Sequence, residues 1–168
     1  IVDKNAIKRK RIDHGDYHYL NLNGDISYAR RYNLGNTISL YQDDYNADEY
    51  IISGISQGED WGSWTDGERL FMNLYIPDNK SMYKGELDVV KNFYHPQRMI
   101  ILVNDETVYD SVIEDPQKVT FSFENNNLGI YRVEIHLPDA IRPTDVMESQ
   151  DSRKLGVGLR TVIIDGCD

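Results

Sequence analysis

The sequence predicts an all-β fold, a two-sheet antiparallel β-sandwich of jelly-roll-like type. Along several short segments, apolar and polar residues alternate with a period of two, which is the pattern of a strand with one buried face. No segment of ten or more residues has the apolar spacing of an amphipathic helix. Short strands that follow one another in this way, separated by turn residues, are typical of a sandwich.

The expected strands can be placed along the chain from this period. The clearest is at residues 70–76, where every second residue is apolar and Pro77 ends the run. Clusters of Asn, Asp and Gly predict the turns, and a tight hairpin is expected over residues 103–109. In chain order, we expect strands at residues 17–22, 37–40, 50–52, 70–76, 86–90, 98–103, 118–123, 130–137 and 159–164.

Length and composition predict one globular domain. The chain has 168 residues, of which 40% are hydrophobic and 27% charged, which is enough to bury a core without disulfide or metal support. Residues 1–14 lack the strand period and are expected to form a polar lead-in to a single domain at residues 15–168. The only cysteine, Cys167, excludes an internal disulfide and a cysteine-based metal site.

The charge argues against nucleic acid and anionic membrane surfaces as general partners. The formal net charge is −10, with 28 acidic residues against 18 Lys and Arg, whereas a phosphate backbone requires a basic footprint. The four histidines show no metal-ligand spacing, so we expect no cofactor, although acidic loops could supply oxygen ligands for a structural calcium ion. The chain begins with Ile1 rather than Met and holds no apolar run near the ~20 residues of a membrane span. We therefore expect a piece of a longer protein or a processed form.

Residues 58–67 hold both tryptophans among acidic and small residues. An indole offers a large flat apolar surface on which a sugar ring can stack, while charged or amide side chains bind the sugar hydroxyls. A second stretch, residues 149–159, puts an acid and a base beside a Gly-x-Gly. The residues expected to contact carbohydrate are Glu59, Trp61, Trp64, Asp66, Asp151 and Arg153.

The same residues also have a structural interpretation. One indole would close an end of the sandwich, and Asp151 and Arg153 would form an ion pair that holds the loop before the last strand. Buried tryptophans outnumber those that stack on ligands. The structural interpretation therefore stands beside the binding one.

A serine hydrolase or esterase is a further alternative, because residues 54–58, Gly-Ile-Ser-Gln-Gly, fit the Gly-x-Ser-x-Gly string. In hydrolases this string turns from a strand into a helix, and no helix is predicted after it in this chain. We therefore expect Ser56 to lie in a loop and to take no part in catalysis.

Four blocks of the sequence occur in a recognisable order. They are Gly35-Asn36-Thr37-Ile38-Ser39-Leu40, a Gly-x-Ser, acid, Trp-Gly-x-Trp-Thr block over residues 54–65, Ile100-Ile101-Leu102-Val103-Asn104, and a closing block of Pro143, Ser149, Asp151 and Arg153-Lys154-Leu155-Gly156-Val157-Gly158-Leu159. In these blocks the chain resembles the C-terminal extracytoplasmic β-sandwich module of bacterial membrane-anchored enzymes that modify glycans. Examples are phosphoglycerol transferases of the osmoregulated periplasmic glucan pathway and certain cell-surface glycosyltransferases.

The resemblance implies a place outside the cytoplasmic membrane, in the periplasm or at the cell surface, tethered through a membrane-embedded parent protein. It also implies that the chemistry belongs to the parent and not to this domain. We therefore expect a non-catalytic accessory module whose partners are a polysaccharide or oligosaccharide and the transmembrane portion of its own parent. The alternative within this resemblance is an interaction module that orients its parent enzyme without binding sugar.

Overall fold

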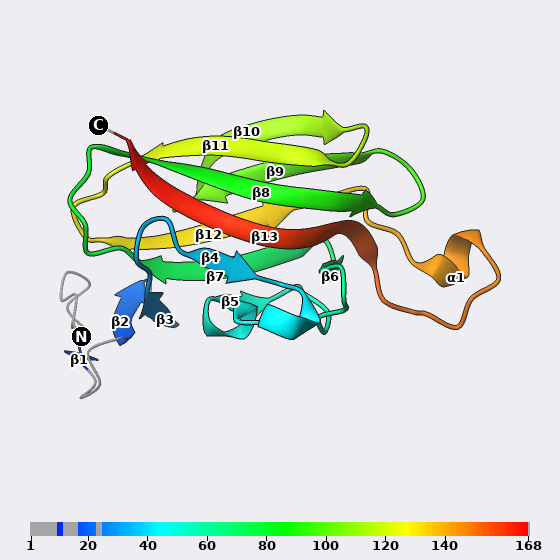
Figure 1. Ribbon diagram of the computed structural model, residues 1–168, viewed down its shortest axis with the longest axis horizontal. Coiled ribbons are helices and arrows are strands. Elements are labelled where there is room, and N and C mark those ends of the chain that lie inside the picture. Colours follow the sequence, from blue (N-terminus) through cyan, green and yellow to red (C-terminus); the bar gives the residue numbers. More distant parts are fainter. Residues whose placement is uncertain (1–9, 12–16, 23–24, 168) are drawn as a thin grey trace, which may run out of the picture.

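The computed structural model of the chain describes residues 10–11, 17–22 and 25–167. It confirms the predicted fold class, because two β-sheets pack face to face as a sandwich (Figure 1). Of the predicted lead-in at residues 1–14, all but Lys10 and Arg11 lies outside the described residues.

The first sheet has eight strands, ordered β1-β2-β3-β7-β12-β9-β10, with β5 also paired to β7. Their bounds are β1 Lys10–Arg11, β2 Tyr17–Leu22, β3 Asp25–Arg31, β5 Ile51–Ser53, β7 Arg69–Tyr75, β9 Gln97–Val103, β10 Glu106–Ile113 and β12 Ile130–His136. The second sheet has five strands, ordered β11-β8-β13-β4, with β6 also paired to β13. Their bounds are β4 Thr37–Ser39, β6 Ser63–Asp66, β8 Met82–Asn92, β11 Gln117–Glu124 and β13 Leu155–Cys167.

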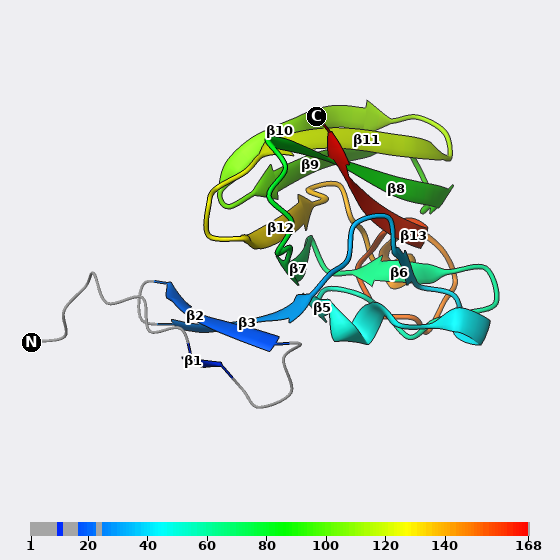
Figure 2. The ribbon, with the colours of Figure 1, turned by 60° about the vertical axis from the view of Figure 1, so that its left-hand side comes forward.

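From β7 onward the chain passes repeatedly from one sheet to the other, which is the jelly-roll-like connectivity expected. Between described strands every pairing is antiparallel except that of β3 with β7. Through this parallel pairing, a ribbon of β1, β2 and β3 is joined to β7 in the first sheet. The ribbon projects away from the packed sheets in Figure 2.

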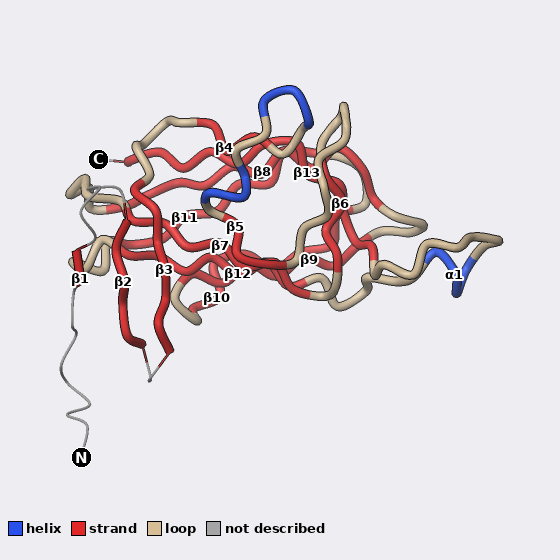
Figure 3. Tube along the Cα trace, turned by 90° about the horizontal axis from the view of Figure 1, so that it is seen from below, coloured by secondary structure: helices blue, strands red, loops and turns tan. Residues whose placement is uncertain are grey.

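Three short helical segments complete the described fold. They are the 3-10 turns η1 (Gln42–Asp44) and η2 (Ala47–Glu49) and the single-turn helix α1 (Pro143–Val146). The loop that carries α1 extends from one end of the sandwich, and the β1–β2–β3 ribbon lies toward the other end (Figure 3). The loops at the α1 end therefore form a surface separate from the ribbon.

The core fills the space between the sheets with the alternate residues that the sequence pattern predicts. In β7, Leu70, Met72 and Leu74 are at most 1% exposed. Tyr32 is also fully buried, and its hydroxyl accepts a hydrogen bond from the Ile164 backbone N–H at 2.9 Å. Burial raises the pKa of Tyr32 to about 12 because the phenolate would be desolvated.

Strand β6 was not predicted, and its composition explains why. Its two inward residues are Ser63 and Thr65, which are polar but fully buried. The Ser63 hydroxyl donates to the Leu40 carbonyl at 2.6 Å, and the Thr65 hydroxyl accepts from the Val157 N–H at 3.1 Å. These hydrogen bonds satisfy polar atoms inside the sandwich, so β6 forms without the apolar alternation that identifies a strand in a sequence.

Candidate functional site

The candidate site lies at the α1 end of the second sheet, where β6 and the end of β8 flank the start of β13 (Figure 1). Within β13, Gly158 is paired on one side with Trp64 and on the other with Lys91. A Cβ atom on Gly158 would lie 2.5 Å from Cζ3 of the Trp61 indole. The missing side chain at Gly158 therefore makes room for Trp61 between the two neighbouring strands.

Trp61 is tied into the fold on several sides. Its indole N–H donates to the Glu59 carboxylate at 2.9 Å, and its ring packs edge-on against Trp64 with centroids 5.3 Å apart. The Lys91 ammonium lies 3.8 Å from the centroid of the Trp61 ring, which is the geometry of a cation–π contact. The donor and one face of this indole are therefore already used within the protein.

Beyond Trp61, the rings continue across the end of the sheet as an aromatic row, which we define as Trp61, Trp64, Phe93, Tyr94 and His95. The successive centroid separations along this row are 5.3, 5.9, 6.4 and 5.7 Å. These spacings are those of interacting aromatic side chains. The row therefore forms one continuous surface built from the loop before β6, β6 itself and the β8–β9 turn.

Tyr94 stands out within the row. It is 60% exposed, and its φ of 68° places a non-glycine residue in the left-handed region. Such a backbone conformation costs free energy, on the order of 1 kcal/mol or more, and burial of this ring does not offset the cost. An outlier of this kind is a reason to look for a function.

The row borders an open hollow of about 630 Å³, which is within the size range of small-ligand sites. Trp64, Lys91 and Tyr94 line the hollow from β6, the end of β8 and the β8–β9 turn, and Glu114 and Asp115 line it from the β10–β11 turn; we call these two groups its walls. The amide of Asn92 joins the two sides by donating to the carbonyls of Ile113 at 2.8 Å and Glu114 at 3.2 Å. The hollow therefore has walls that are hydrogen-bonded to each other.

Next to Trp61 lies a polar cluster, which we define as Glu59, Asp66, Asp151 and Arg153. The Arg153 guanidinium donates to both oxygens of Asp151, at 3.0 and 2.6 Å, so the ion pair expected in the structural interpretation is present. The Asp151 carboxylate raises the pKa of Arg153, with smaller contributions from Asp66 and Glu59, and Arg153 in turn lowers the pKa of Asp151. Within this cluster Asp151 and Arg153 therefore neutralise each other, while Glu59 and Asp66 leave an excess of negative charge.

All six residues proposed from the sequence gather at this end of the sandwich, because β6 and β13 pair directly. Leu155 faces Asp66 across the two strands, and Asp66 accepts a hydrogen bond from the Lys154 N–H at 3.3 Å. Sequence reasoning missed Lys91, Phe93, Tyr94 and His95. A signal for them existed, since three consecutive ring side chains before Pro96 cannot all face the core of a sheet.

Ser56 does not form a nucleophile elbow. It follows β5 in a loop that leads to strand β6 and not to a helix. Its side chain is nearly buried at 9% exposure, and within the described part of the chain its hydroxyl has no hydrogen-bond partner. A serine nucleophile needs a base within hydrogen-bond reach, and Ser56 has none among those residues.

Within the described ranges, no group of three or more His, Cys, Asp or Glu side chains could hold a metal ion. The acidic loops considered as calcium ligands do not form such a group there. In the same part of the chain, no helix has both the length and the apolar character that crossing a membrane requires.

The chain belongs to a family described as "Domain of unknown function (DUF7024)", whose sequence model matches residues 26–165. The match covers both β6 and β13 and therefore the whole candidate site. The family description assigns no activity. No curated protein sequence matches the chain.

Several solved structures are similar at low sequence identity. A family 35 carbohydrate binding module from an environmental isolate aligns over 62% of this chain and 73% of its own, with 11% identity and a TM-score of 0.42. An exo-β-1,3-galactanase from Phanerochaete chrysosporium aligns over 88% of this chain but only 32% of its own, with 14% identity and a TM-score of 0.45. The CBM36-1 domain of a multidomain xylanase from the hindgut metagenome of Trinervitermes trinervoides aligns over 79% of this chain and 98% of its own, with 9% identity and a TM-score of 0.40. Structural similarity at such low sequence identity and TM-score gives no information about a ligand.

Proposed function

We propose that the domain is a non-catalytic module that binds carbohydrate through the aromatic row and the hollow beside it. The observation that carries the proposal is Tyr94, whose ring is 60% exposed on a backbone with φ of 68°. The fold gains little from holding a large ring in water on a strained backbone. A sugar that stacks on the ring would supply the missing contact, because the C–H face of a sugar is apolar while its rim carries hydroxyls.

Trp64 and Tyr94 are the stacking platforms in this proposal, and Trp61 supports them. Trp64 lines the hollow directly, whereas Trp61 has its N–H on Glu59 and the Lys91 ammonium 3.8 Å from its ring centroid. A sugar on that face of Trp61 would have to displace Lys91. The six residues expected from the sequence therefore take two roles, with Trp64 at the ligand and the polar cluster holding the loop behind it.

The polar groups around the hollow suit sugar hydroxyls. Lys91 offers N–H donors on one side, and the carboxylates of Glu114 and Asp115 offer acceptors on the other. A hydroxyl can both donate and accept, so a polyol can use both walls at once. In small-ligand sites, a small number of polar groups at the edge of an apolar surface fixes the orientation of the ligand.

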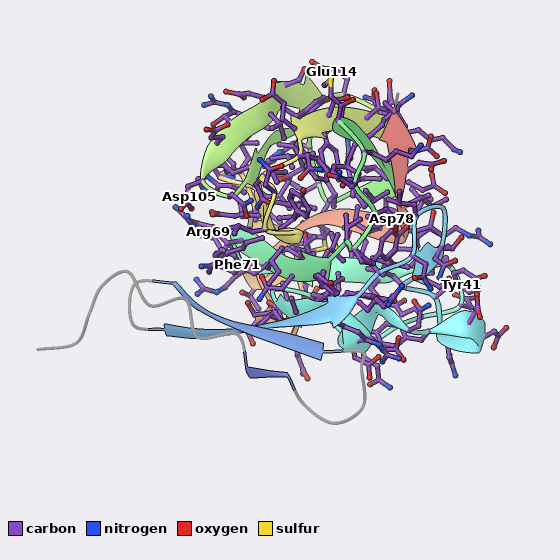
Figure 4. All side chains as sticks on the ribbon, turned by 90° about the vertical axis from the view of Figure 1, so that its left-hand side faces the viewer. Tyr41, Arg69, Phe71, Asp78, Asp105 and Glu114 are labelled. Carbon is purple, nitrogen blue, oxygen red and sulfur yellow. The ribbon has the colours of Figure 1, made fainter. Side chains whose placement is uncertain are left out.

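Affinity electrophoresis and calorimetric titration with a panel of envelope polysaccharides and oligosaccharides test this proposal. We expect Tyr94→Ala to weaken binding about tenfold, as for an aromatic residue at the centre of an interface, and Tyr94→Phe to keep most of it, since the ring stays. Tyr41→Ala is the matched control, because Tyr41 lies well away from Glu114 (Figure 4) and does not line the hollow. A folded wild-type domain that binds none of the panel would contradict the proposal.

We further propose that the domain acts outside the cytoplasmic membrane as part of a membrane-anchored enzyme that modifies glycans. The support is the resemblance of residues 54–65 and 149–159 to such modules, together with the direct pairing of β6 and β13, which makes one site of these two blocks. External protease added to spheroplasts that express the whole gene product should digest the module. Protection of the module in intact spheroplasts would rule out this location.

The alternative of a module that orients its parent without binding sugar makes a different prediction for the same variant. In that case no glycan would bind, and Tyr94→Ala would instead weaken the association of the domain with the membrane part of the protein. Co-purification of the two parts from detergent, with and without the substitution, distinguishes the two functions.

A further inference from the structure

We propose that the hollow beside the aromatic row selects neutral over anionic glycans. This inference rests on the carbohydrate binding proposed above and adds the chemical class of the ligand. It comes from the charges on the two walls of the hollow. Lys91 stands on one wall, and Glu114 and Asp115 stand on the other.

Lys91 is not free to act as a simple anion site. Its ammonium lies 3.8 Å from the centroid of the Trp61 ring and 5.9 Å from that of Trp64. The negative faces of these rings already stabilise its charge, and no carboxylate within the described residues forms a salt bridge with it. Lys91 therefore keeps N–H groups that can donate to a ligand oxygen, while the indole contacts already stabilise part of its charge.

The opposite wall disfavours an anionic ligand. Glu114 and Asp115 are both exposed, and neither forms a salt bridge within the described part of the chain. A carboxylate or phosphate on the glycan would face two like charges against one ammonium. The whole chain adds to this repulsion, since its net charge is −10.

The hydrogen bonds of Asn92 keep the two walls in place. Its amide donates to the carbonyls of Ile113 and Glu114, so the turn that carries the carboxylates cannot move away from β8 without breaking them. Sugar hydroxyls can use the groups of both walls, so we expect a neutral glycan to bind more tightly than an anionic one.

Affinity electrophoresis in gels that hold neutral and anionic polymers with the same backbone tests this inference. The pairs are hydroxyethyl-cellulose with carboxymethyl-cellulose, and methyl-esterified pectin with polygalacturonate. We expect at least one neutral member to bind, and its anionic counterpart to bind about tenfold more weakly or worse, because like-charge contacts are costly. Removing the facing charges with Glu114→Gln and Asp115→Asn together should restore most of the lost affinity for the anionic polymer.

The matched control removes the same net charge at the other end of the sandwich, with Asp105→Asn in the β9–β10 turn and Glu106→Gln at the start of β10. If this control restores anionic binding as well as the site variant does, the selection comes from net charge and the inference about the hollow is wrong. An anionic member that binds as tightly as its neutral counterpart also overturns it. If no polymer or oligomer binds to the folded domain, the carbohydrate function itself fails, so the two failures are distinguishable.

Discussion

The polar cluster and the outer part of the aromatic row lie at the same end of the sandwich but differ in what holds them. Arg153 and Asp151 have each other as partners, and Asp66 binds the backbone of the loop. The Tyr94 side chain, in contrast, has ring contacts with Phe93 and His95 but no hydrogen bond among residues 25–167, and it is 60% exposed. The first region is complete without a ligand and the second is not, which is why we assign structure to one and binding to the other.

The largest effect is expected where the structural region is assembled. Gly62 has a φ of 150°, and a Cβ atom there would overlap the Leu159 carbonyl oxygen in β13. We expect Gly62→Ala to lower the free energy of unfolding by about 3 kcal/mol, because backbone strain and overpacking act together. Urea denaturation monitored by tryptophan fluorescence measures this change.

Gly67→Ala is the control for that substitution. Gly67 also has a positive φ, of 98°, but nothing lies within 4 Å of the position its Cβ would take. We expect a loss of about 1 kcal/mol there, from backbone strain alone. Equal losses at the two positions would mean that β6 and β13 do not need their close contact, and the structural assignment would be wrong.

Much of this fold could be read from the period of the sequence. Each of the nine expected strands overlaps an observed one, and the hairpin at residues 103–109 forms around Asn104 and Asp105, both with positive φ as tight hairpins require. Strand β6 could not be read, because its buried residues are Ser63 and Thr65 and their hydroxyls bond to backbone that is distant in sequence. The alternation of apolar and polar residues within one segment carries no information about hydrogen-bond partners elsewhere in the sequence.

The candidate site was only half predictable for a similar reason. Trp61, Trp64 and Arg153 were noticed as motifs, yet their meeting depends on the register of Leu155 with Asp66, which is a long-range pairing. Tyr94 was missed because its exposure results from a left-handed turn conformation that a tyrosine rarely adopts. The sequence shows which residues are aromatic. Whether an aromatic ring is buried in the fold or exposed for a ligand depends on the residues that the fold places beside it.

A smaller effect of opposite sign is expected in the binding region. Tyr94→Gly should relieve the left-handed strain at φ of 68° and leave stability unchanged or raise it by up to about 1 kcal/mol. The same substitution should weaken glycan binding about tenfold, as we expect for Tyr94→Ala, because the ring is gone. Urea midpoints and affinity electrophoresis of one preparation measure both. A clear loss of stability would show that Tyr94 serves the fold, and the contrast between the two regions would disappear.

The smallest effect concerns the Asp151–Arg153 pair and depends on pH. Arg153 lowers the pKa of Asp151 in the folded protein, so the pair stabilises the fold above the ordinary carboxylate pKa of about 4, and this contribution is lost as the pH falls through the lowered value. Because both side chains are partly exposed, we expect less than about 1 kcal/mol. The difference in unfolding free energy between wild type and Asp151→Asn should therefore shrink from pH 6 to pH 3, while glycan binding at pH 7 stays unchanged. If Asp151→Asn keeps the stability of the wild type but loses glycan binding, Asp151 contacts the ligand, which is the role that the sequence analysis predicts for it.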